Sequence, residues 1–508
     1  MASKREEPSL QSVVWMEKQV KKKRAKRTIP KSHRQQPQAK SLSLKDPEYE
    51  DQWHLTRIFA PDAWARGATG KYVQIAVVDD GMDWQNNDLL PNFNSQGSYD
   101  VVDGNSDPEP DSSDAHGTAV SGVVGGASND FCGVGVAPEV KMGAVRILGD
   151  TELGDEEEGE ALRYRYDLNY VFSNSWGPVD DGQTIEGPGR LTQLLMKNAV
   201  EHGRQGRGSV YVWAGGNGGE KGDNVNYDGF ANSIFTIAVC AINDEDKRPS
   251  YSEYGACLIC CAPSSSGTSG HKQIITTSLV TGDGCFAEFG GTSAAAPMVA
   301  GVVALMLDVR PSLTWRDVQG ILVESSDIVD PHDDGWMTND AGLLYNHAYG
   351  YGIVNANRAV ETAISWDLYS PQIKMSTEVF DTSDRLIYPA VVLEDFYRFQ
   401  VGEDIILEQI QIVFNCTATI RGDVVTSLIS PTGMVSRLSE KHADGNPDYA
   451  WTFSSTAHWG GSSKGVWELQ VRNAGSHTVA LNSYQVFFYG RKEEEEGEER
   501  QRRGRERH

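Results

Sequence analysis

Residues 73–81 read Val-Gln-Ile-Ala-Val-Val-Asp-Asp-Gly, an apolar run that ends in two carboxylates and a glycine. Such a continuous apolar run is typical of a strand that is buried on both faces of a sheet. Similar runs lie at 209–214 and 234–241, and the first of these is followed by Gly-Gly-Asn-Gly-Gly. Helical patterns alternate with these strands, which predicts an α/β fold with a mostly parallel sheet and helices on both faces. We expect those helices at 117–125, 190–202, 293–307 and 314–323.

The sequence changes in character after Trp366. Short runs of alternating apolar and polar residues follow, separated by Gly, Pro and Asp, and this pattern is typical of an all-β sandwich or jelly roll. Residues 491–508 are mostly Glu and Arg, so we predict a charged, disordered tail there. The clearest β runs lie at 405–413, 424–429, 466–471 and 484–489.

The composition limits the classes of partner. The chain has 508 residues, 71 of them acidic and 46 basic, so its formal net charge is −25. Its 39% of hydrophobic residues can bury a sizeable core, and at roughly 100–200 residues per domain the length allows about two to four domains. Nucleic acid is a disfavoured partner because phosphate binding needs a basic surface. Cationic substrates and metal cations suit an acidic protein better.

The sequence shows neither the apolar run of a membrane span nor that of a signal peptide. The longest apolar run of the α/β part, Val302–Leu307, is far shorter than the roughly 20 residues that span a bilayer. The first thirty residues are basic and lack the apolar stretch of a signal peptide. We therefore expect no membrane anchor in this chain. We expect either a cytosolic protein or one whose true N-terminus is missing here.

A basic run, Lys-Lys-Lys-Arg-Ala-Lys-Arg, occupies residues 21–27. One interpretation is a solvated basic segment or a nuclear-localisation patch. The other is a processing site at which the chain is cut after Arg27. The run by itself does not separate the two.

Three motifs supply the residue types of a nucleophilic triad. Asp79 ends the first strand run, His116 opens a helical segment in His-Gly-Thr, and Ser293 opens another in Gly-Thr-Ser-Ala. A carboxylate can hold a histidine tautomer, the histidine can take a serine proton, and a helix N-terminus favours the negative charge that then develops. Each motif alone is more typical of a turn or a helix cap. The three together, in this order on an α/β pattern, predict a catalytic triad.

Asn217 lies in the glycine-rich segment after the strand at 209–214. An asparagine there can be a residue that tolerates a tight turn. Beside a triad, its amide can also donate a hydrogen bond to the oxyanion of a tetrahedral intermediate. We predict the second role.

At this point the chain resembles the kexin/furin-type proprotein convertases of the subtilase superfamily, which share the order Asp, His, Ser. The resemblance covers about residues 46–366, with a P domain behind. It implies a subtilisin-like α/β peptidase domain at 46–367 and a jelly-roll P domain at 368–490. It also implies the end of a propeptide at 1–27, cut after Arg27, and a linker at 28–45. The motifs that carry it are VVDDG (77–81), HGT (116–118), NSWGPVDDG (174–182), NYDGFANSI (226–234), GTSAAAP (291–297) and LTWRDVQ (313–319).

The resemblance implies a calcium-dependent serine endoprotease that cleaves proproteins after paired or multiple basic residues. It implies the secretory pathway as location and the protein's own propeptide as an inhibitor. Two other interpretations stay open: an inactive convertase-like binding module and a broad-specificity degradative subtilase. The complete triad argues against the first, and the paired acids and the P domain argue against the second.

Basic substrates need carboxylates, and the resemblance assigns several acids to subsites. Asp180 and Asp228 would line the first subsite, and Asp80 the second. Glu158 and Glu186 would line the fourth. In a chain this acidic, any single one can instead be a solvated surface carboxylate.

Several features depart from the family pattern, among them a segment between Leu55 and Ala63 that is shorter than usual. The family usually has an acid where this chain has Ser113, with Asp114 shifted by one residue, and this puts the strength of the second subsite in question. The family tyrosine of the Asp-Gly-Tyr motif is Phe230 here.

Calcium takes oxygen ligands, and the resemblance implies three sets of them. None of the three has the spacing of an EF-hand loop, and surface acidity is the alternative, above all for the third set. The first set is Asp46, Asp88 and Asn129 with the carbonyls of Gly126, Phe131 and Gly133; the second is Asp180, Asp223 and Glu253; the third is Asp100, Asp107 and Glu109.

Seven cysteines leave at least one thiol over in a monomer. The resemblance pairs Cys132 with Cys285, whereas the usual partner of Cys257 is replaced by Val225. The segment Cys-Leu-Ile-Cys-Cys at 257–261 is poor evidence for zinc, and we predict buried thiols there. Asn415 begins an Asn-Cys-Thr glycosylation sequon, which is usable only in a secreted chain.

Overall fold

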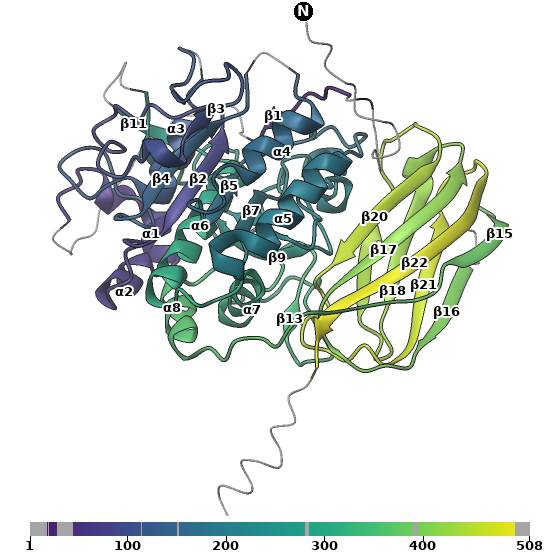
Figure 1. The fold of residues 1–508 in the computed structure, drawn as a ribbon. Helices are drawn as coiled ribbons and strands as arrows, with labels where there is room; N and C mark the ends of the chain where they lie inside the picture. Colours follow the sequence, from purple (N-terminus) through teal and green to yellow (C-terminus); the bar gives the residue numbers. More distant parts are fainter. Residues whose placement is uncertain are drawn as a thin grey trace, which may run out of the picture.

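The structure, a computed structural model, has two lobes side by side (Figure 1). The N-terminal lobe holds a sheet among helices, and the described part of the C-terminal lobe holds strands and one 3₁₀ turn. Most of the predicted linker, Ser113 and nearly all of the predicted tail lie outside the described residues. The described residues are 18, 20–27, 44–112, 114–149, 152–279, 284–389 and 395–492.

The core of the first lobe is a seven-stranded sheet in the order β3-β4-β2-β5-β7-β8-β9. All of its strand pairs are parallel. Strands β2, β5, β7, β8 and β9 are buried along their whole length, because helices cover both faces of the sheet. The predicted α/β class is confirmed, and the three predicted strands are β2, β7 and β8. The bounds are β2 Gln74–Asp79, β3 Tyr99–Asp100, β4 Lys141–Arg146, β5 Val171–Asn174, β7 Val210–Ala214, β8 Thr236–Ile242 and β9 Leu258–Pro263.

All four predicted helices are present, as α3, α5, α6 and α7. Helix α6 contacts the sheet strands β5, β7, β8 and β9 and is apolar all round. It is the one described helix long and apolar enough to cross a membrane, but 89% of it is buried inside the protein, as in a core helix. The bounds are α1 Trp53–Arg57, α2 Ala60–Ala65, α3 His116–Gly125, α4 Asp155–Arg163, α5 Arg190–Gly206, α6 Thr292–Val309, α7 Trp315–Ser325 and α8 Ala356–Ser365.

Short elements complete the first lobe. Three two-stranded antiparallel ribbons pair β1 with β6, β10 with β11, and β12 with β13. The bounds are β1 Ala25–Lys26, β6 Trp176–Gly177, β10 Ile274–Thr277, β11 Cys285–Phe289, β12 Met337–Thr338 and β13 Leu344–Tyr345, with 3₁₀ turns at Tyr49–Asp51, Ser95–Gly97, Gly219–Lys221 and Val225–Tyr227.

The second lobe is a sandwich of two antiparallel sheets, as predicted. One sheet has the order β14-β22-β17-β20, with β15 also pairing with β22, and the other has the order β16-β21-β18-β19. The core between them contains Trp467 and Phe488, whose ring centroids are 5.3 Å apart. The bounds are β14 Ile373–Ser376, β15 Phe380–Ile387, β16 Asp395–Val401, β17 Ile406–Ala418, β18 Val424–Ile429, β19 Val435–Ser439, β20 Tyr449–Ser455, β21 Gly465–Asn473 and β22 Val479–Arg491, with a 3₁₀ turn at Arg421–Asp423.

Polar contacts join the two lobes. The Arg316 guanidinium of α7 lies 2.7 Å from the Glu408 carboxylate of β17, and both are buried. The Tyr351 hydroxyl donates to the carbonyl of Thr456 at 2.7 Å. These paired groups fix the sandwich against the α/β lobe.

The cysteines differ in part from the prediction. Cys132 and Cys285 form a disulfide, as the resemblance implies. The prediction of buried thiols at 257–261 is wrong for Cys261, which forms a second disulfide with Cys240. The reason is the parallel register, because β8 and β9 place these two residues directly opposite each other, with Cα atoms 4.3 Å apart. The described free thiols are all buried: Cys257, Cys260 and Cys416.

Candidate active site

The carboxyl edge of the parallel sheet gathers the three predicted triad residues. Asp79 is the last residue of β2, His116 is the first residue of α3, and Ser293 is the second residue of α6. Asn217 lies just beyond the end of β7, two strands away from β2. Parallel strands end at one edge, so side chains more than 200 residues apart in sequence meet there.

The triad residues are buried and ordered by hydrogen bonds. The Nδ1 atom of His116 lies 2.7 Å from Oδ1 of Asp79, which leaves Nε2 of the ring as the free nitrogen. That Nε2 is buried and has no hydrogen-bond partner among the described residues. The Ser293 hydroxyl donates to the Ser175 carbonyl at 3.3 Å. The histidine is thus held in the tautomer that can accept a serine proton.

Neighbouring charges set the basicity of His116. Burial lowers its pKa, but the Asp79 carboxylate and, to a lesser degree, Asp80 outweigh burial, so the pKa is raised above its ordinary value. The Lys26 ammonium acts in the opposite direction. A histidine whose pKa is raised by a carboxylate partner is a stronger base, which suits general-base chemistry beside a serine.

The predicted oxyanion residues lie at the N-terminus of α6. The backbone N–H of Ser293 donates to the carbonyl oxygen of Arg27 at 3.3 Å. The Asn217 side-chain oxygen accepts from Thr292 N–H at 2.9 Å, which leaves its buried Nδ2 without a partner. Gly291 has a φ of +78°, and a Cβ there would lie 2.2 Å from the Arg27 oxygen and 3.0 Å from that Nδ2. The Arg27 carbonyl therefore lies among the donors that an oxyanion would need.

The basic run at 21–27 occupies the cleft as an extended strand. Its two-residue strand β1 pairs antiparallel with β6, with Ala25 opposite Gly177. Further along, Lys22 and Leu153 exchange two backbone hydrogen bonds, of 2.6 and 3.0 Å. Main-chain pairing of this kind aligns a peptide regardless of its sequence, and the side chains then meet separate pockets.

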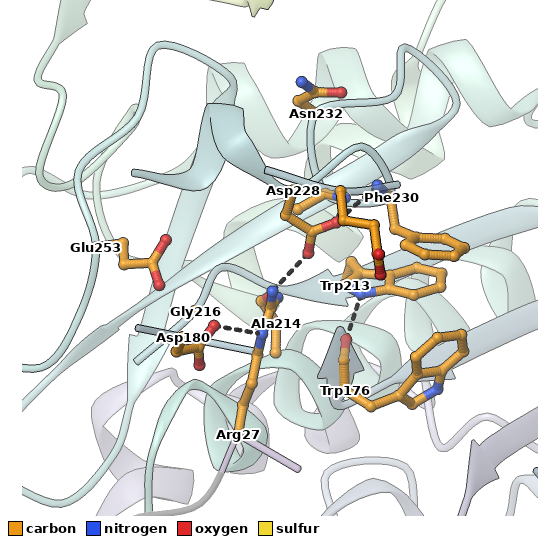
Figure 2. A network of polar contacts seen from close by, with 12 residues as sticks. Arg27, Trp176, Asp180, Trp213, Ala214, Gly216, Asp228, Phe230, Asn232 and Glu253 are labelled. Atoms are coloured by element: carbon orange, nitrogen blue, oxygen red, sulfur yellow. Dashed lines mark hydrogen bonds and ion pairs between the residues drawn. The ribbon is translucent and has the colours of Figure 1, made fainter. Parts of the chain in front are cut away.

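The Arg27 side chain fills a closed pocket and is 1% exposed (Figure 2). Its guanidinium lies 2.5 Å from Asp228 and 3.5 Å from Asp180, and it also donates to the Ala214 carbonyl. In Figure 2, dashed lines join the guanidinium to Asp228 and to Asp180, and Glu253 lies further out. Two carboxylates and a carbonyl around one planar cation match the donor geometry of a guanidinium.

The next basic side chains meet the other predicted acids. The Lys26 ammonium lies 2.5 Å from Asp80. The Arg24 guanidinium lies 2.6 Å from Glu158 and contacts Glu186. Burial raises the pKa of Glu158 to about 7, although the cation of Arg24 opposes this shift. All five acids assigned to subsites therefore face a basic residue of the run.

The sequence analysis assigned no role to several residues that contact the basic run in the cleft. Asp114 lies 2.9 Å from the Lys26 ammonium, the Phe230 ring lies 5.0 Å from the Arg24 guanidinium, and the Gly187 carbonyl accepts from the Lys22 ammonium at 2.8 Å. For Asp114, the sequence did carry a signal, because an acid follows directly after Ser113 at the position where the family has one. For a backbone carbonyl, the sequence carries no signal.

The second predicted calcium set converges. Carboxylate oxygens of Asp180, Asp223 and Glu253 lie within 4.8 Å of one another, next to the Arg27 pocket. Burial raises the pKa of Asp223 to about 7 and that of Glu253 well above its usual range; the neighbouring carboxylates add to both shifts, and the Arg27 cation opposes them. Buried oxygen ligands with uncompensated charge fit a hard divalent cation.

The first predicted set is partly assembled. Asn129 lies between two carboxylates: its backbone N–H donates to Asp46 at 2.8 Å, and its amide lies 3.4 Å from Asp88. Burial raises the pKa of Asp88 to about 7. The Gly126 carbonyl accepts from the Gly135 N–H at 2.9 Å. The carbonyls of Phe131 and Gly133 belong to the same loop, next to Cys132.

The third predicted set does not converge. Among the described residues, Asp180, Asp223 and Glu253 form the one group of three such side chains within 4.8 Å, so Asp100, Asp107 and Glu109 do not form one. Asp100 instead lies 2.9 Å from the buried Arg146 guanidinium. Asp107 accepts from the Trp84 indole at 3.0 Å. Arg146 already supplies the positive charge that a calcium ion would bring.

The glycosylation sequon lies on the second lobe, far from this cleft in sequence. Asn415 and Thr417 are exposed on β17, on the opposite side of the strand from the buried Cys416.

Comparison with known families matches two segments of the chain. Residues 70–352 match the subtilase family, Peptidase S8, and residues 407–488 match the proprotein convertase P-domain. The first segment contains the triad and the acid pockets, and the second lies within the sandwich.

Curated relatives cover nearly the whole chain. Proprotein convertase subtilisin/kexin type 7 of Mus musculus is 36% identical over 94% of this chain and 64% of its own length. Kexin of Saccharomyces cerevisiae is 36% identical over 88% of this chain and 57% of its own. Furin of Mus musculus is 36% identical over 94% of this chain and 60% of its own. The chain thus spans less than two thirds of the length of these relatives.

Solved structures show the same overall fold. The serine protease of Aeromonas sobria superposes with a TM-score of 0.81, at 22% sequence identity, over 89% of this chain and 96% of its own. The same protease in complex with its chaperone gives a TM-score of 0.81 at 20% identity. At these identities the likeness shows the fold. Together with the family match, it shows that this chain belongs to the subtilase family, where it resembles the kexin/furin-type proprotein convertases.

Proposed function

We propose that this chain is a calcium-dependent serine endoprotease that cleaves proproteins after paired or multiple basic residues. The observation that carries the proposal is the occupied cleft, in which the Arg27 carbonyl lies 3.3 Å from the Ser293 N–H and the preceding basic side chains face acids. On this proposal, residues 1–27 are the end of a propeptide and 28–45 a linker. The peptidase domain spans 46–367, the P domain 368–490 and a charged tail 491–508.

The geometry supports acyl-enzyme chemistry. His116 Nε2 takes the proton of the Ser293 hydroxyl, which attacks the carbonyl of the basic residue bound as Arg27 is. Asn217 Nδ2 and the Ser293 N–H hold the oxyanion. Asp79 keeps the imidazole oriented and stabilises the imidazolium without taking the proton itself. His116 then protonates the leaving amine, and water releases the acyl group in a second, equivalent step.

Calcium enters the proposal through the buried acids. Asp180, Asp223 and Glu253 would hold one ion, and Asp46 and Asp88 would hold another beside Asn129. A bound ion supplies positive charge that stabilises these carboxylates in their ionised form. The site of Asp180, Asp223 and Glu253 shares Asp180 with the pocket that holds Arg27. Ion binding at this site therefore affects the shape of that pocket.

The proposed partners follow from the cleft. Proproteins with exposed basic sites are substrates, and the protein's own propeptide, seated through Arg24, Lys26 and Arg27, is an inhibitor until it leaves. A secretory location agrees with the disulfides and with the exposed sequon at Asn415. An inactive binding module would not need a triad with a free, buried His116 Nε2. A degradative protease would not need three acid-lined pockets.

The test uses Ser293→Ala. Removal of the nucleophile lowers turnover by roughly 10⁶-fold and leaves the Arg27–Thr28 bond uncut, as read by intact mass. A wild-type chain labels with a fluorophosphonate and shows a new N-terminus at Thr28. A Thr28 N-terminus in purified Ser293→Ala protein, without another protease, contradicts self-processing. For calcium, the melting temperature of the same variant falls in excess chelator, and an unchanged value contradicts the ion sites.

A further inference from the structure

The basic run in the cleft is held at three side chains and one backbone position. Arg27 fills the closed pocket between two carboxylates, the Lys26 ammonium lies 2.5 Å from a carboxylate, and the Arg24 guanidinium lies 2.6 Å from another. Ala25, between Arg24 and Lys26, pairs through its backbone with Gly177. The cleft thus accepts an arginine, then a residue held by its backbone, then a basic residue and a final arginine.

This order of residue types occurs at two places in the sequence of 508 residues. The first is Arg24–Arg27 in the cleft, and the second is Arg-Gln-Arg-Arg at 500–503. The two segments have the same arginine at each end and differ in the middle, where the second has Gln501 and Arg502. All three side chains that would meet acids in the cleft are therefore basic in the second segment as well.

The other basic pairs that end in arginine do not have this order. The Arg248 guanidinium, moreover, lies 4.2 Å from the ring centroid of Tyr254, and the Arg248 backbone N–H donates to the Tyr349 hydroxyl at 3.1 Å. An extended pairing like that of β1 would break these contacts. None of the other pairs has an arginine three residues before its last residue; they lie at 4–5, 23–24 and 247–248.

Residues 493–508 follow the last strand of the sandwich and lie outside the described residues. Their sequence has no apolar side chain with which to join a core. At the end of β22, Arg491 is fixed 3.4 Å from Glu408 and 3.8 Å from the ring centroid of Tyr369. In Figure 1, β22 ends at the lower side of the molecule, whereas β1 lies at its upper side. Residues 493–508 therefore meet the cleft of another copy more readily than their own.

We propose that the Arg503–Gly504 bond is a second cleavage site of this protease, cut in the cleft of another copy of the chain. The inference rests on the proposed endoprotease function and names a substrate for it. Ser293 Oγ attacks the Arg503 carbonyl, the C–N bond to Gly504 breaks, and His116 gives the serine proton to the Gly504 amine. Water then hydrolyses the ester. The products are a chain that ends in the Arg503 carboxylate and a peptide of residues 504–508.

Further from the cut, the two segments differ in charge. The Lys22 ammonium donates to the Gly187 carbonyl at 2.8 Å. At the same distance from the cut the second segment has Glu498, which offers that carbonyl no donor in a cleft lined by acids. Loss of this charged hydrogen bond predicts a kcat/KM about 10-fold lower than for the sequence that ends at Arg27. Because residues 21–27 fill the cleft, the second cut follows their departure.

The experiment uses the full Ser293→Ala chain as substrate, because it cannot cut itself, and adds a small amount of mature wild-type enzyme. Intact mass and peptide mapping should show a chain that ends at Arg503. In the same background, Arg503→Gln should slow this cut about 100-fold and Arg500→Gln about 10-fold, since buried carboxylates then lack a cation. Arg505→Gln removes one charge from the same segment and is the control, with an expected change of less than about 2-fold.

The outcomes separate this inference from the function on which it rests. If the enzyme cuts a peptide with Arg-Ala-Lys-Arg before the cut but leaves Arg503–Gly504 intact, the second site is overturned and the proposed function stands. Equal slowing by Arg503→Gln and Arg505→Gln would mean an effect of total charge and also overturns it. In wild-type protein, a rate of the second cut that does not rise with protein concentration contradicts cleavage by another copy. If Ser293 labels with a fluorophosphonate but neither bond is cut, the dibasic function itself is wrong.

Discussion

At the scale of single residues, the two carboxylate oxygens of Asp228 have different contacts: one contacts the Arg27 side chain and the other holds the local backbone. Oδ2 lies 2.5 Å from the Arg27 guanidinium, whereas Oδ1 accepts the backbone N–H of Phe230 at 2.7 Å. An asparagine can keep the second bond through its oxygen, but its amide then faces the guanidinium with a donor. Recognition can therefore be lost while the loop stays in place.

Asp228→Asn should weaken cleavage after arginine with little effect on Ser293. Breaking a buried charge pair costs about 2–5 kcal/mol, and we expect the lower half of that range because Asp180 and the Ala214 carbonyl remain. The measurement is kcat/KM for matched peptides with arginine or a neutral residue at the cut, together with fluorophosphonate labelling. Asp181→Asn is the control, since that carboxylate accepts backbone N–H groups of Gln183 and Thr184. Unchanged relative rates in Asp228→Asn would show that Asp228 does not read charge.

At the scale of elements, the start of helix α6 matters as much as the side chain it carries. Gly291 has a positive φ and lies against the Arg27 carbonyl, so the helix begins where the substrate backbone passes. A side chain at this point would fill the oxyanion site. The glycine of the Gly-Thr-Ser motif is thus part of the cleft surface as well as a helix start.

Gly291→Ala should abolish peptide cleavage beyond its effect on folding. A Cβ would lie 2.2 Å from the Arg27 oxygen, so we expect a loss of about 10²-fold or more, comparable to removal of an oxyanion donor. The matched control is Gly67→Ala, which has a φ of +89° and nothing within 4 Å of the added carbon. Both variants place an alanine at a positive φ, and Gly291, with φ +78° and ψ +174°, lies in a region that is essentially restricted to glycine; the strain, on the order of 1–3 kcal/mol, is read for each variant from its melting temperature. A similar loss of activity in both variants would assign the effect to strain.

At the scale of the whole molecule, buried histidines lie where the two lobes meet. His347 Nε2 accepts the backbone N–H of Arg437 at 2.9 Å, and His458 Nε2 lies 2.9 Å from the Ser436 hydroxyl. Within the described part of the chain, the Nδ1 atom of each is buried and has no hydrogen-bond partner. Burial lowers the pKa of both His347 and His458 to about 3. The junction is therefore built for neutral imidazoles.

Lowering the pH should reduce the folding stability through these two histidines. In the unfolded chain these histidines bind a proton below about pH 6.5, whereas in the folded chain they stay neutral, so folding stability falls as the pH drops from there. The expected slope is on the order of 1 kcal/mol per pH unit for each histidine. Melting temperatures between pH 7 and 5 measure it, and the double variant His347→Gln, His458→Gln should show a shallower fall. His202→Gln, on the exposed face of α5, should leave the slope unchanged, and an equally steep fall in the double variant would contradict the assignment.

The sequence alone determined the fold class and the chemistry of the centre. Apolar runs of strand length ending in Asp79 and before Asn217 indicated a buried parallel sheet, and the local motifs around His116 and Ser293 indicated helix starts. These features are encoded by neighbouring residues, so local patterns suffice to find them. The less apolar elements β4 and α4 were not predicted, because β4 begins with an exposed lysine and α4 carries five acids.

Only the tertiary structure decided which distant groups meet. It placed Asp114 against Lys26, Cys240 opposite Cys261, and Arg146 against Asp100 where a calcium set was expected. Each of these pairings depends on the register and crossover of strands, which bring together residues 21 to 88 positions apart. Composition says that acids are plentiful in this chain. The packed fold alone determines which of them faces a substrate, which faces an arginine of the protein, and which are left, like Asp223 and Glu253, with room for a cation.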